Sequence, residues 1–312
     1  MTRVAAVDCG TNTVKLLIAD LDPSTGEEAE LVRESRMVRL GQGVDRTGRL
    51  ADEALERVFA AVEEYAALVA EHQAERVRFC ATSASRDASN ADVFADGVEK
   101  RLGTRPEVVS GAEEARLSFD GATRHLGVVP SPVLVVDIGG GSTELVLGSA
   151  TGGSRPVVDA GRSLDIGSVR MTERHLHSDP PTDVQVGAAS ADVQSALDRL
   201  PAYGVQPERA RTVVAVSGTG LTVAAAALDL DGLDRARIDG AVVPLGAVRE
   251  AAVRLLSMSV QERLGLPYMH PGRADVIGAG ALILDAVLRR TRVDELRVSV
   301  RDILDGIAWS CL

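Results

Sequence analysis

The sequence is poor in cysteine and histidine, the residues that most often build crosslinks and transition-metal sites. Cys9, Cys80 and Cys311 are too few and too widely spaced for a disulfide framework, and no two have the spacing of a zinc-binding pair. Cys9 lies in an expected loop, and we interpret it as a small apolar residue. His175 and His177 are two positions apart, which does not suit two ligands on one helix face. The pattern argues against a disulfide-stapled fold and a structural zinc site.

Long apolar runs and a basic charge are also missing. No apolar stretch approaches the length of a membrane span, and the first residues, "MTRVAAVDCG", contain no apolar signal region ahead of a cleavage site. We therefore expect a cytoplasmic protein with no membrane partner. The formal net charge of −11 argues against a general nucleic-acid binder, which would carry a basic surface. An anionic substrate stays open, because its binding depends on the local field and on any metal.

The chain has 312 residues, enough for two domains, and an ordinary globular balance of 45% hydrophobic and 25% charged residues. Its positive charge is uneven, because five arginines lie close together in one stretch: Arg33, Arg36, Arg39, Arg46 and Arg49. Two interpretations remain open for this stretch. It is either a solvated strand-and-loop face or part of a track for an anion.

Apolar periodicity predicts alternating strands and helices. Strand, turn and strand are expected over 4–20 and again from 133. Short strands are expected at 77–81, 108–109, 212–216 and 296–300. Helices are expected at 52–69, 91–102, from Ser110, after the breaker at 178–183, at 249–256, at 274–288 and at the C-terminus. The segment "TSASRDASN" is expected to be a polar connection. The order of elements is that of an α/β protein.

An internal repeat relates the two strand-turn-strand segments. When Val4 is laid on Val133, 129 residues later, Asp8 falls on Asp137. The same offset matches further pairs: Val7 with Val136, Gly10 with Gly139, Thr13 with Ser142, and Leu16 with Leu145. A repeat at this distance is the size of a domain. It predicts two related α/β halves, each offering one loop to a shared cleft.

The residues of these loops suit phosphate chemistry. Glycines let the backbone approach a ligand closely, and successive N–H groups in such a turn form an anion-binding concavity. Hydroxyl groups add donors from Thr11, Thr13, Ser142 and Thr143. Carboxylates suit Mg²⁺, which binds oxygen ligands, and the candidates are Asp8, Asp137 and Glu144. Donors for phosphate beside carboxylates for a metal predict a phosphoryl-transfer site. A glycine hairpin without a ligand would explain one such loop, but not two matched copies.

At this point several segments, in this order, resemble a known family. They are "AVDCGTNTVKLLIAD", "ATSASRDASN", "SGAEEARLSFDG", "VVDIGGGSTELVLG", "DIGSVRMTE", "SGTGLTVAAAAL" and "PGRADVIGAGALIL". Together they resemble the exopolyphosphatase and guanosine-pentaphosphate phosphohydrolase family, in its short form, from about Val4 to Gly306. The resemblance implies the fold of the actin-like ATPase and sugar-kinase superfamily, with two ribonuclease H-like α/β domains around a central cleft. We place an N-terminal domain at 1–125 and a C-terminal domain at 126–299, with the last helix, about 300–312, packing back on the first domain.

The resemblance also implies roles for individual residues. Glu114 matches the catalytic base, and its neighbour Glu113 is interpreted as a solvated or helix-capping acid. Asp8, Asp137 and Glu144 match the acids that place the metal, Mg²⁺ or Mn²⁺. The phosphate-binding matches are Gly10, Thr11, Asn12, Lys15, Arg86, Gly139, Gly140, Gly141, Ser142, Thr143, Gly218 and Thr219.

The chain departs from the family pattern at the first and third loops. The first loop usually continues Asn-Ser-x-Arg, but here Lys15 stands in place of the arginine, which keeps the charge and loses the planar fork. The third loop is "SGTG", where the family more often has Gly-Gly-Thr. Lys15 is one of only two lysines, the other being Lys100. It either contacts the ligand as a point charge or faces away.

The implied reaction is hydrolysis of a terminal phosphate by a water that Glu114 activates. Inorganic polyphosphate is the favoured substrate, with guanosine pentaphosphate as the alternative. Two other classes stay open, a superfamily kinase and a non-enzymatic nucleotide-gated protein. Phosphate release without an acceptor would separate hydrolase from kinase. The resemblance leaves open whether the chain acts as a homodimer.

Overall fold

The computed structural model describes residues 1–150 and 156–312, and the chain divides into two compact units. Unit 1 consists of Met1–Gly121 and Ile303–Leu312, and unit 2 consists of Ala122–Asp302. The expected domain boundaries lay a few residues away, at 125–126 and near 300. In the described ranges, no helix combines the length and the apolar character needed to cross a membrane.

Unit 1 is built on a five-stranded sheet in the order β3-β2-β1-β4-β5. β1, β2 and β3 form an antiparallel meander, and β4 and β5 continue the sheet parallel to β1. The strands are β1 Thr2–Cys9, β2 Thr13–Leu21, β3 Glu28–Met37, β4 Arg76–Ala81 and β5 Glu107–Val108. The helices are α1 Val44–Thr47, α2 Asp52–Glu71, α3 Ser83–Asp87, α4 Ala91–Leu102, α5 Gly111–Thr123 and α13 Ile303–Ser310.

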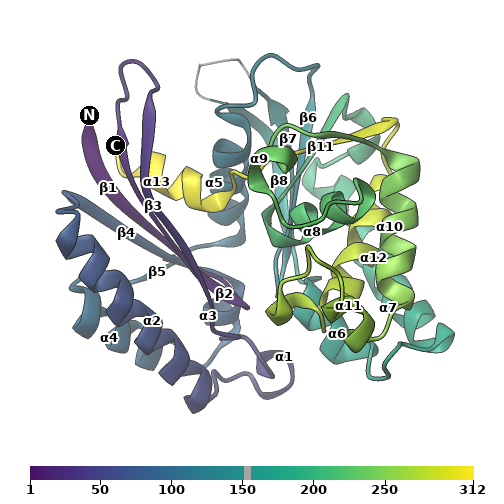
Figure 1. The fold of residues 1–312 in the computed structure, drawn as a ribbon, viewed down its shortest axis with the longest axis horizontal. Coiled ribbons are helices and arrows are strands. Elements are labelled where there is room, and N and C mark those ends of the chain that lie inside the picture. The colour runs from purple at the N-terminus through teal and green to yellow at the C-terminus, as the bar shows by residue number, and fades with distance from the viewer. Residues whose placement is uncertain (151–155) are drawn as a thin grey trace. The chain divides into compact units, whose positions relative to one another are not determined.

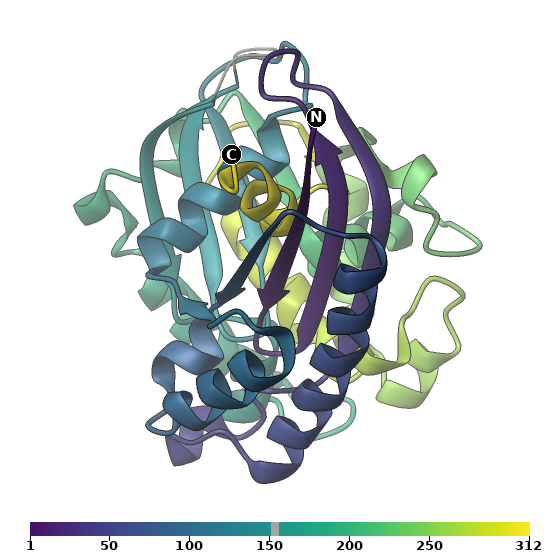
Figure 2. The ribbon, with the colours of Figure 1, turned by 90° about the vertical axis from the view of Figure 1, so that its left-hand side faces the viewer.

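Helices cover both faces of this sheet (Figures 1 and 2). Side chains alternate between the faces along a strand, so Val7 of β1 packs with the α2 and α4 residues, whereas Ala6 packs with α13. Both faces are apolar, which explains why β1 and β2 are nearly continuous hydrophobic runs. Cys9, at the end of β1, is 1% exposed, and burial raises the pKa of its thiol. The interpretation of Cys9 as an apolar residue is therefore confirmed.

Unit 2 is built on a six-stranded sheet in the order β10-β11-β9-β6-β7-β8. Its strands are β6 Val133–Ile138, β7 Thr143–Ser149, β8 Val157–Leu164, β9 Thr212–Val216, β10 Val242–Pro244 and β11 Glu295–Val298. Its α-helices are α6 Ser168–His175, α7 Asp183–Leu197, α8 Ser217–Ala227, α9 Arg235–Ile238, α10 Leu245–Ser257, α11 Val260–Leu264 and α12 Ile277–Leu288. One hydrophobic core joins one face of the sheet to α6, α7, α8, α10 and α12, with α12 buried along almost its whole length (Figure 1).

The two sheets repeat one topology. In both, two antiparallel strands follow the first strand on one side, and parallel strands follow on the other side. β8-β7-β6-β9-β11 thus corresponds to β3-β2-β1-β4-β5, and unit 2 adds β10 at its edge. Two α/β units with this repeated strand order confirm the predicted actin-like fold class.

The predicted helices at 52–69, 91–102, 249–256 and 274–288 are all present, as α2, α4, α10 and α12. The "TSASRDASN" connection differs from the prediction, because it contains the short helix α3. The third strand of each meander, β3 or β8, also lacked a clear sequence signal. Each is an edge strand with many exposed or half-buried residues, so its hydrophobic alternation is weak.

One buried ion pair ties the C-terminal helix to the sheet of unit 1. Arg33 of β3 donates two hydrogen bonds to Asp305 of α13, at 2.6 and 3.3 Å. The Asp305 side chain is 1% exposed and that of Arg33 is 13% exposed. Trp309, one turn farther along α13, donates from its indole nitrogen to Glu28 at 3.0 Å. These contacts clamp α13 to the edge of the meander.

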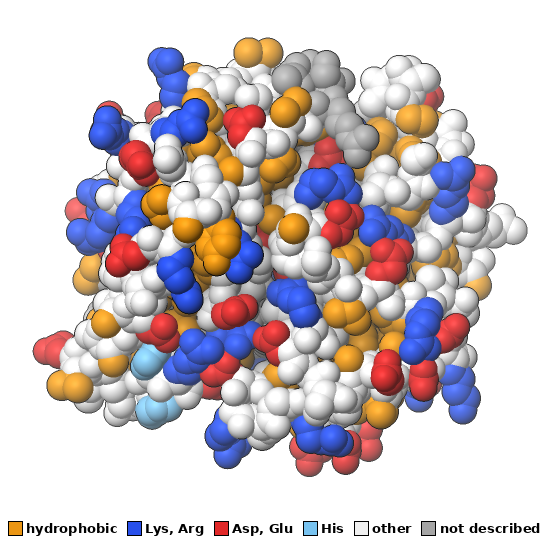
Figure 3. Space-filling view, turned by 180° about the vertical axis from the view of Figure 1, so that it is seen from behind, with side chains coloured by type: hydrophobic (Ala, Val, Ile, Leu, Met, Phe, Trp, Pro, Cys, Tyr) orange, Lys and Arg blue, Asp and Glu red, His pale blue; other side chains and the backbone are white. Residues whose placement is uncertain are grey.

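This arrangement changes the interpretation of the arginine-rich stretch. Arg33 is engaged with Asp305, and Arg36 bonds to Glu34 at 2.6 Å and Glu64 at 3.0 Å. These ion pairs favour the interpretation of a charged face for Arg33 and Arg36, and the anion track stays a prediction. Figure 3 shows the same intermixing of Lys and Arg with Asp and Glu side chains over the face that it displays.

We predict that Arg33→Met destabilises the protein by about 3 kcal/mol, because it leaves the buried Asp305 carboxylate without its main counter-charge. Arg36→Met is the matched control, since its partners are exposed and such pairs contribute roughly 1 kcal/mol or less. Urea unfolding of both variants measures the difference. Equal destabilisation by the two substitutions would contradict the special role of the Arg33–Asp305 pair.

Candidate active site

The two glycine turns expected from the repeat have the same geometry. In unit 1 the Gly10 N–H donates to the Thr13 carbonyl at 2.9 Å, and in unit 2 the Gly139 N–H donates to the Ser142 carbonyl at 3.0 Å. Each turn connects the first two strands of its sheet. The sequence repeat is therefore confirmed down to one backbone hydrogen bond.

In unit 2, the start of α6 holds the carbonyl groups of the turn. The Ser168 N–H donates to the Gly139 carbonyl and the Val169 N–H to the Gly140 carbonyl, both at 2.9 Å. The guanidinium of Arg170 completes the set with a 2.7 Å bond to the Gly141 carbonyl.

The N–H groups of Gly140, Gly141 and Ser142 donate no hydrogen bond to any residue of the described ranges 1–150 and 156–312. A turn whose carbonyl groups are satisfied and whose N–H groups remain available is an anion-binding concavity. The phosphate-loop prediction for 139–142 therefore has a structural basis in backbone donors.

In unit 1 a different segment satisfies the carbonyl groups of the turn. The Thr11 carbonyl accepts from the Gly41 N–H at 2.8 Å, and the Asn12 carbonyl accepts from the N–H groups of Val38 and Arg39 at 3.0 and 2.9 Å. The loop after β3 therefore takes the place that α6 takes in unit 2. The Thr11 hydroxyl lies 3.0 Å from that of Ser83, at the start of α3.

The acids next to the turns differ between the units. Asp137 of β6 and Glu144 of β7 are directly opposite each other and are 5% and 3% exposed. The Ser163 hydroxyl donates to Glu144 Oε1 at 2.7 Å, which fixes that carboxylate. A buried pair of carboxylates beside a phosphate loop fits Mg²⁺, which commonly binds one or two carboxylates together with substrate phosphates.

Asp8 is in a different situation from Asp137 and Glu144. It belongs to unit 1, and its Oδ2 lies 3.4 Å from Nζ of Lys15, the residue opposite it on β2. Within either unit, no three His, Cys, Asp or Glu side chains of the described residues form a metal-binding group. Asp8 thus has an ammonium group close to its carboxylate, and the metal set Asp8, Asp137 and Glu144 stays a prediction.

The predicted base is buried and held by a predicted phosphate ligand. Glu114 lies in the first turn of α5 and is 6% exposed. Arg86 of α3 donates from Nη1 to Glu114 Oε2 at 3.0 Å and to the Val109 carbonyl, also at 3.0 Å. No sequence pattern indicates that these two candidates are partners. The bond from Arg86 orients the Glu114 carboxylate.

The neighbouring acid Glu113 has a structural role. Arg116 donates two hydrogen bonds to it, at 2.8 and 3.0 Å, and Arg78 lies 3.5 Å away. The bonds from Arg116 hold the pKa of Glu113 below its usual value. Ser110 caps the helix by accepting the Glu113 N–H at 3.2 Å. Glu113 is thus an ion-paired residue of the first turn of α5.

Two predicted phosphate-binding hydroxyls are engaged within the protein. Thr143 donates its hydroxyl to the Ile166 carbonyl, and Thr219 donates its hydroxyl to the Ile138 carbonyl at 3.0 Å. Both side chains are buried, at 0% and 3% exposure. The Thr143 hydroxyl thus ties the segment after β8 to the start of β7, and the Thr219 hydroxyl ties α8 to the end of β6. Phosphate binding by these two residues stays a prediction.

Arg273, which no sequence pattern marked as a site residue, lies over the third loop. A Cβ on Gly218 would lie 1.6 Å from Nη1 of Arg273, so the guanidinium sits directly over this glycine. Burial lowers the pKa of Arg273, and the charge of Asp302 raises it. Ser217 has a positive φ of 57°, and at this residue the chain passes from β9 into α8. The only sequence signal was that Arg273 lies inside the recognised segment "PGRADVIGAGALIL".

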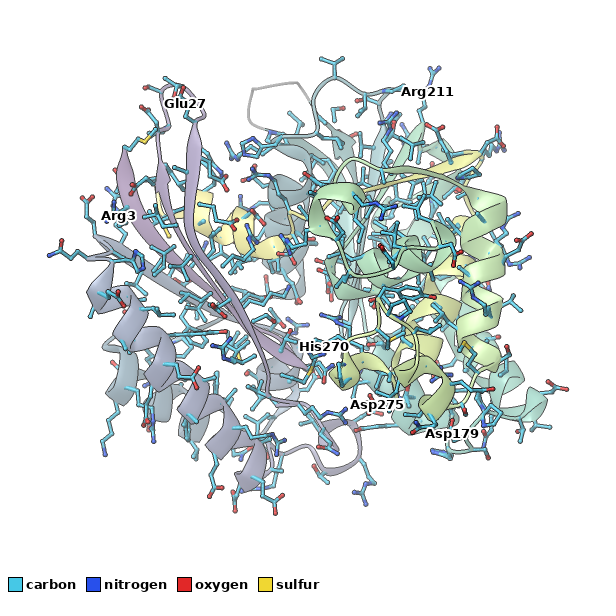
Figure 4. The ribbon with its side chains drawn as sticks, viewed as in Figure 1. Arg3, Glu27, Asp179, Arg211, His270 and Asp275 are labelled. Carbon is cyan, nitrogen blue, oxygen red and sulfur yellow. The ribbon has the colours of Figure 1, made fainter. Side chains whose placement is uncertain are left out.

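A buried arginine supports the segment of Arg273. Arg263 is 3% exposed and donates to the carbonyl groups of Leu255, Leu256 and Ala274 at 2.7, 3.3 and 2.9 Å. These bonds tie the end of α10 to the chain directly after Arg273. Figure 4 labels His270 and Asp275, which flank Arg273 along this segment.

Two actin-like units with paired glycine turns, a buried glutamate at the start of α5 and a buried carboxylate pair fit a phosphoryl-transfer protein. The profile of the Ppx/GppA phosphatase family matches residues 22–312, and the chain belongs to this family. The resemblance noted from the motifs is thereby confirmed, and the protein is a phosphohydrolase of the Ppx/GppA type.

Three relatives illustrate the similarity. Exopolyphosphatase 2 of Mycobacterium tuberculosis (strain H37Rv) is 49% identical over 99% of this chain and 98% of its own length. A guanosine-5'-triphosphate,3'-diphosphate pyrophosphatase of Photobacterium profundum is 28% identical over 99% of this chain and 59% of its own length. A crystal structure of an exopolyphosphatase-like protein has a TM-score of 0.94 and 44% identity, covering 99% of this chain and 97% of that one.

We predict that Gly167→Ala lowers phosphatase activity by roughly 10²-fold, because displacing a site by about 1 Å has effects of this size. The added Cβ would lie 2.4 Å from the Gly140 carbonyl oxygen and 2.5 Å from the Gly141 carbonyl carbon, so the turn must shift. Phosphate release by the purified variant measures the effect.

Gly187→Ala in α7 is the matched control. Its Cβ would meet nothing within 4 Å, and alanine favours a helix over glycine by about 1 kcal/mol. We expect unchanged activity and a slightly higher Tm. Full activity of Gly167→Ala would contradict the dependence of the turn on α6.

Proposed function

We propose that this protein is an exopolyphosphatase, which removes the terminal phosphate of inorganic polyphosphate and releases orthophosphate. The observation that carries the proposal is the turn at Gly139–Ser142, where three N–H groups are available next to Asp137 and Glu144. Donors of this kind bind the oxygens of a terminal phosphate. The 49% identity to a relative named exopolyphosphatase 2 supports polyphosphate as the substrate.

In this proposal Glu114 is the general base. Arg86 donates to Oε2 of the carboxylate and holds the group in place. A lone pair of the carboxylate then accepts a proton from water as the water oxygen attacks the terminal phosphorus. The bond from phosphorus to the bridging oxygen breaks, and the shortened polyphosphate leaves as a stable anion. A base of this type contributes roughly 10²–10⁴-fold to the rate.

We propose that Asp137 and Glu144 hold Mg²⁺ or Mn²⁺. When bound, the ion supplies positive charge that offsets the charge of the transferred phosphoryl group. The carboxylates supply oxygen ligands of the kind that Mg²⁺ prefers, and Ser163 fixes one of them. The Gly140, Gly141 and Ser142 N–H groups stabilise the same developing charge through the backbone.

Guanosine pentaphosphate is the second candidate substrate, because the Photobacterium profundum relative, which matches nearly all of this chain, is named as a guanosine-5'-triphosphate,3'-diphosphate pyrophosphatase. Its terminal 5'-phosphate offers the same reacting group as a polyphosphate end. Unlike polyphosphate, a guanosine compound also carries a base and a sugar, which the protein would need to bind.

We predict that Glu114→Gln lowers kcat by 10²–10⁴-fold, on the order expected for a lost general base, with little change in stability or KM. The amide keeps the shape of the side chain and cannot accept the proton. Initial rates of phosphate release, measured over a range of polyphosphate concentrations, give kcat and KM. Glu113→Gln is the control with near-normal turnover, and the reverse pattern would show that Glu113 is the base.

We predict phosphate release from polyphosphate with no acceptor present, in an assay that compares long and short polyphosphate, guanosine pentaphosphate and ATP side by side. Release should stop in excess chelator and return with Mg²⁺, since the carboxylate pair is proposed to act through the ion. Full activity in excess chelator would contradict the proposal that a metal ion takes part. Faster hydrolysis of guanosine pentaphosphate than of every polyphosphate would replace the preferred substrate with the alternative.

A further inference from the structure

The last helix, α13, packs directly on the helix that carries the candidate base. Glu114, Leu117 and the whole of α13 belong to unit 1. Gly306 of α13 is buried, and a Cβ at this position would overlap the Leu117 carbonyl oxygen and lie 2.8 Å from the carbonyl carbon. The two helix backbones therefore touch at Gly306, and a residue with a side chain fits there only if one helix shifts.

The point of contact on α5 lies close to the base. Leu117 is three positions after Glu114 on this helix, so the two residues lie about one turn apart on the same face. The Leu117 side chain is 1% exposed and shares an apolar cluster with five α13 residues: Ile303, Leu304, Ile307, Ala308 and Trp309. Because hydrogen bonds tie each helical turn to the next, a shift of the backbone at Leu117 also moves Glu114.

The sheet of unit 1 holds α13 on the other side of this contact. Three side-chain bonds run from Arg33 to Asp305 at 2.6 Å, from Trp309 to Glu28 at 3.0 Å and from Arg78 to Ser310 at 2.6 Å. Asp305 directly precedes Gly306, so α13 is fixed at the contact itself. A side chain at position 306 therefore displaces α5 and leaves α13 in place.

We infer that Gly306 is a positioning residue for the phosphatase reaction, because it lets α5 rest on α13 at the distance that places Glu114. The inference rests on the proposed function, since it takes Glu114 as the general base. The 3.0 Å bond from Arg86 to Glu114 shows how closely the carboxylate is placed within unit 1. Displacing a catalytic group by about 1 Å costs roughly 10²-fold in rate.

The experiment compares two glycines that lie in tightly packed helices of unit 1. Gly306→Ala should lower kcat for polyphosphate hydrolysis by roughly 10- to 10²-fold with little change in KM, because a base acts in the chemical step. Gly97→Ala in α4 is the matched control, since its Cβ would overlap the ring of Phe59 in α2, a contact that does not involve α5. Gly97→Ala should keep a kcat near that of the wild type.

A second measurement separates positioning from general damage. With the base already removed by Glu114→Gln, misplacing its side chain has little left to cost, so adding Gly306→Ala should hardly lower the rate further. A merely structural defect would lower the rate by the same factor in both backgrounds, and that result overturns the inference. Trp309, the single tryptophan of the chain, lies on α13, and wild-type fluorescence emission shows that this helix stays packed.

The outcomes for the inference and for the proposed function can be told apart. A wild-type kcat in folded Gly306→Ala, together with the expected loss in Glu114→Gln, overturns the inference and leaves the base assigned. Wild-type turnover of Glu114→Gln overturns the proposed base, and the inference with it. Should Gly306→Ala fail to fold, Arg33→Met takes its place, because Arg33 holds the residue next to Gly306. A lower kcat at unchanged KM then supports the inference, and a wild-type kcat overturns it.

Discussion

The close contact between Gly167 and the turn at Gly139–Gly141 is the constraint on which the candidate site of unit 2 depends. No side chain larger than hydrogen fits at position 167, since a Cβ would lie 2.4 Å from the Gly140 oxygen. This proximity lets the start of α6 bond to three successive carbonyl groups. A peptide group whose oxygen is held on one side directs its N–H to the other. The anion-binding donors are thus a consequence of packing.

In unit 1 the carbonyl groups of the turn are also satisfied, but by a segment of different sequence. There the chain directly after β3, Val38–Gly41, donates the N–H groups that satisfy the Thr11 and Asn12 carbonyls. The two units therefore share the turn and its hydrogen bond but not the element that supports it. They also share the aspartate at the end of the first strand, which meets lysine in one unit and glutamate in the other. A repeated scaffold with one changed residue yields an internal ion pair in unit 1 and a candidate metal pair in unit 2.

Half-buried or buried arginines hold segments in place within each unit. Arg86 orients Glu114, Arg33 anchors α13 through Asp305, and Arg263 holds the segment that carries Arg273. A guanidinium suits these positions because its planar set of five donors bonds to several acceptors at once and stays charged when buried. Lysine is rare in this chain, and Lys15 places a compact charge 3.4 Å from the Asp8 carboxylate.

The amino-acid sequence by itself determined the α/β class, the repeat, the glycine turns, the four main helices and the identity of the acids, because each depends on local periodicity or on residue types that few other environments use. The tertiary structure alone decided which groups are partners. Three contacts join segments that are far apart in the chain. They are the pairing of Arg86 with Glu114, the pairing of Arg33 with Asp305, and the position of Arg273 over Gly218. The tertiary structure also decided that the hydroxyls of Thr143 and Thr219 bond to carbonyl groups, and that the ammonium group of Lys15 lies close to Asp8. Hydrogen bonding and charge pairing act over a few ångströms in space, whatever the separation in sequence, so these choices are made only when the sheets and helices have packed.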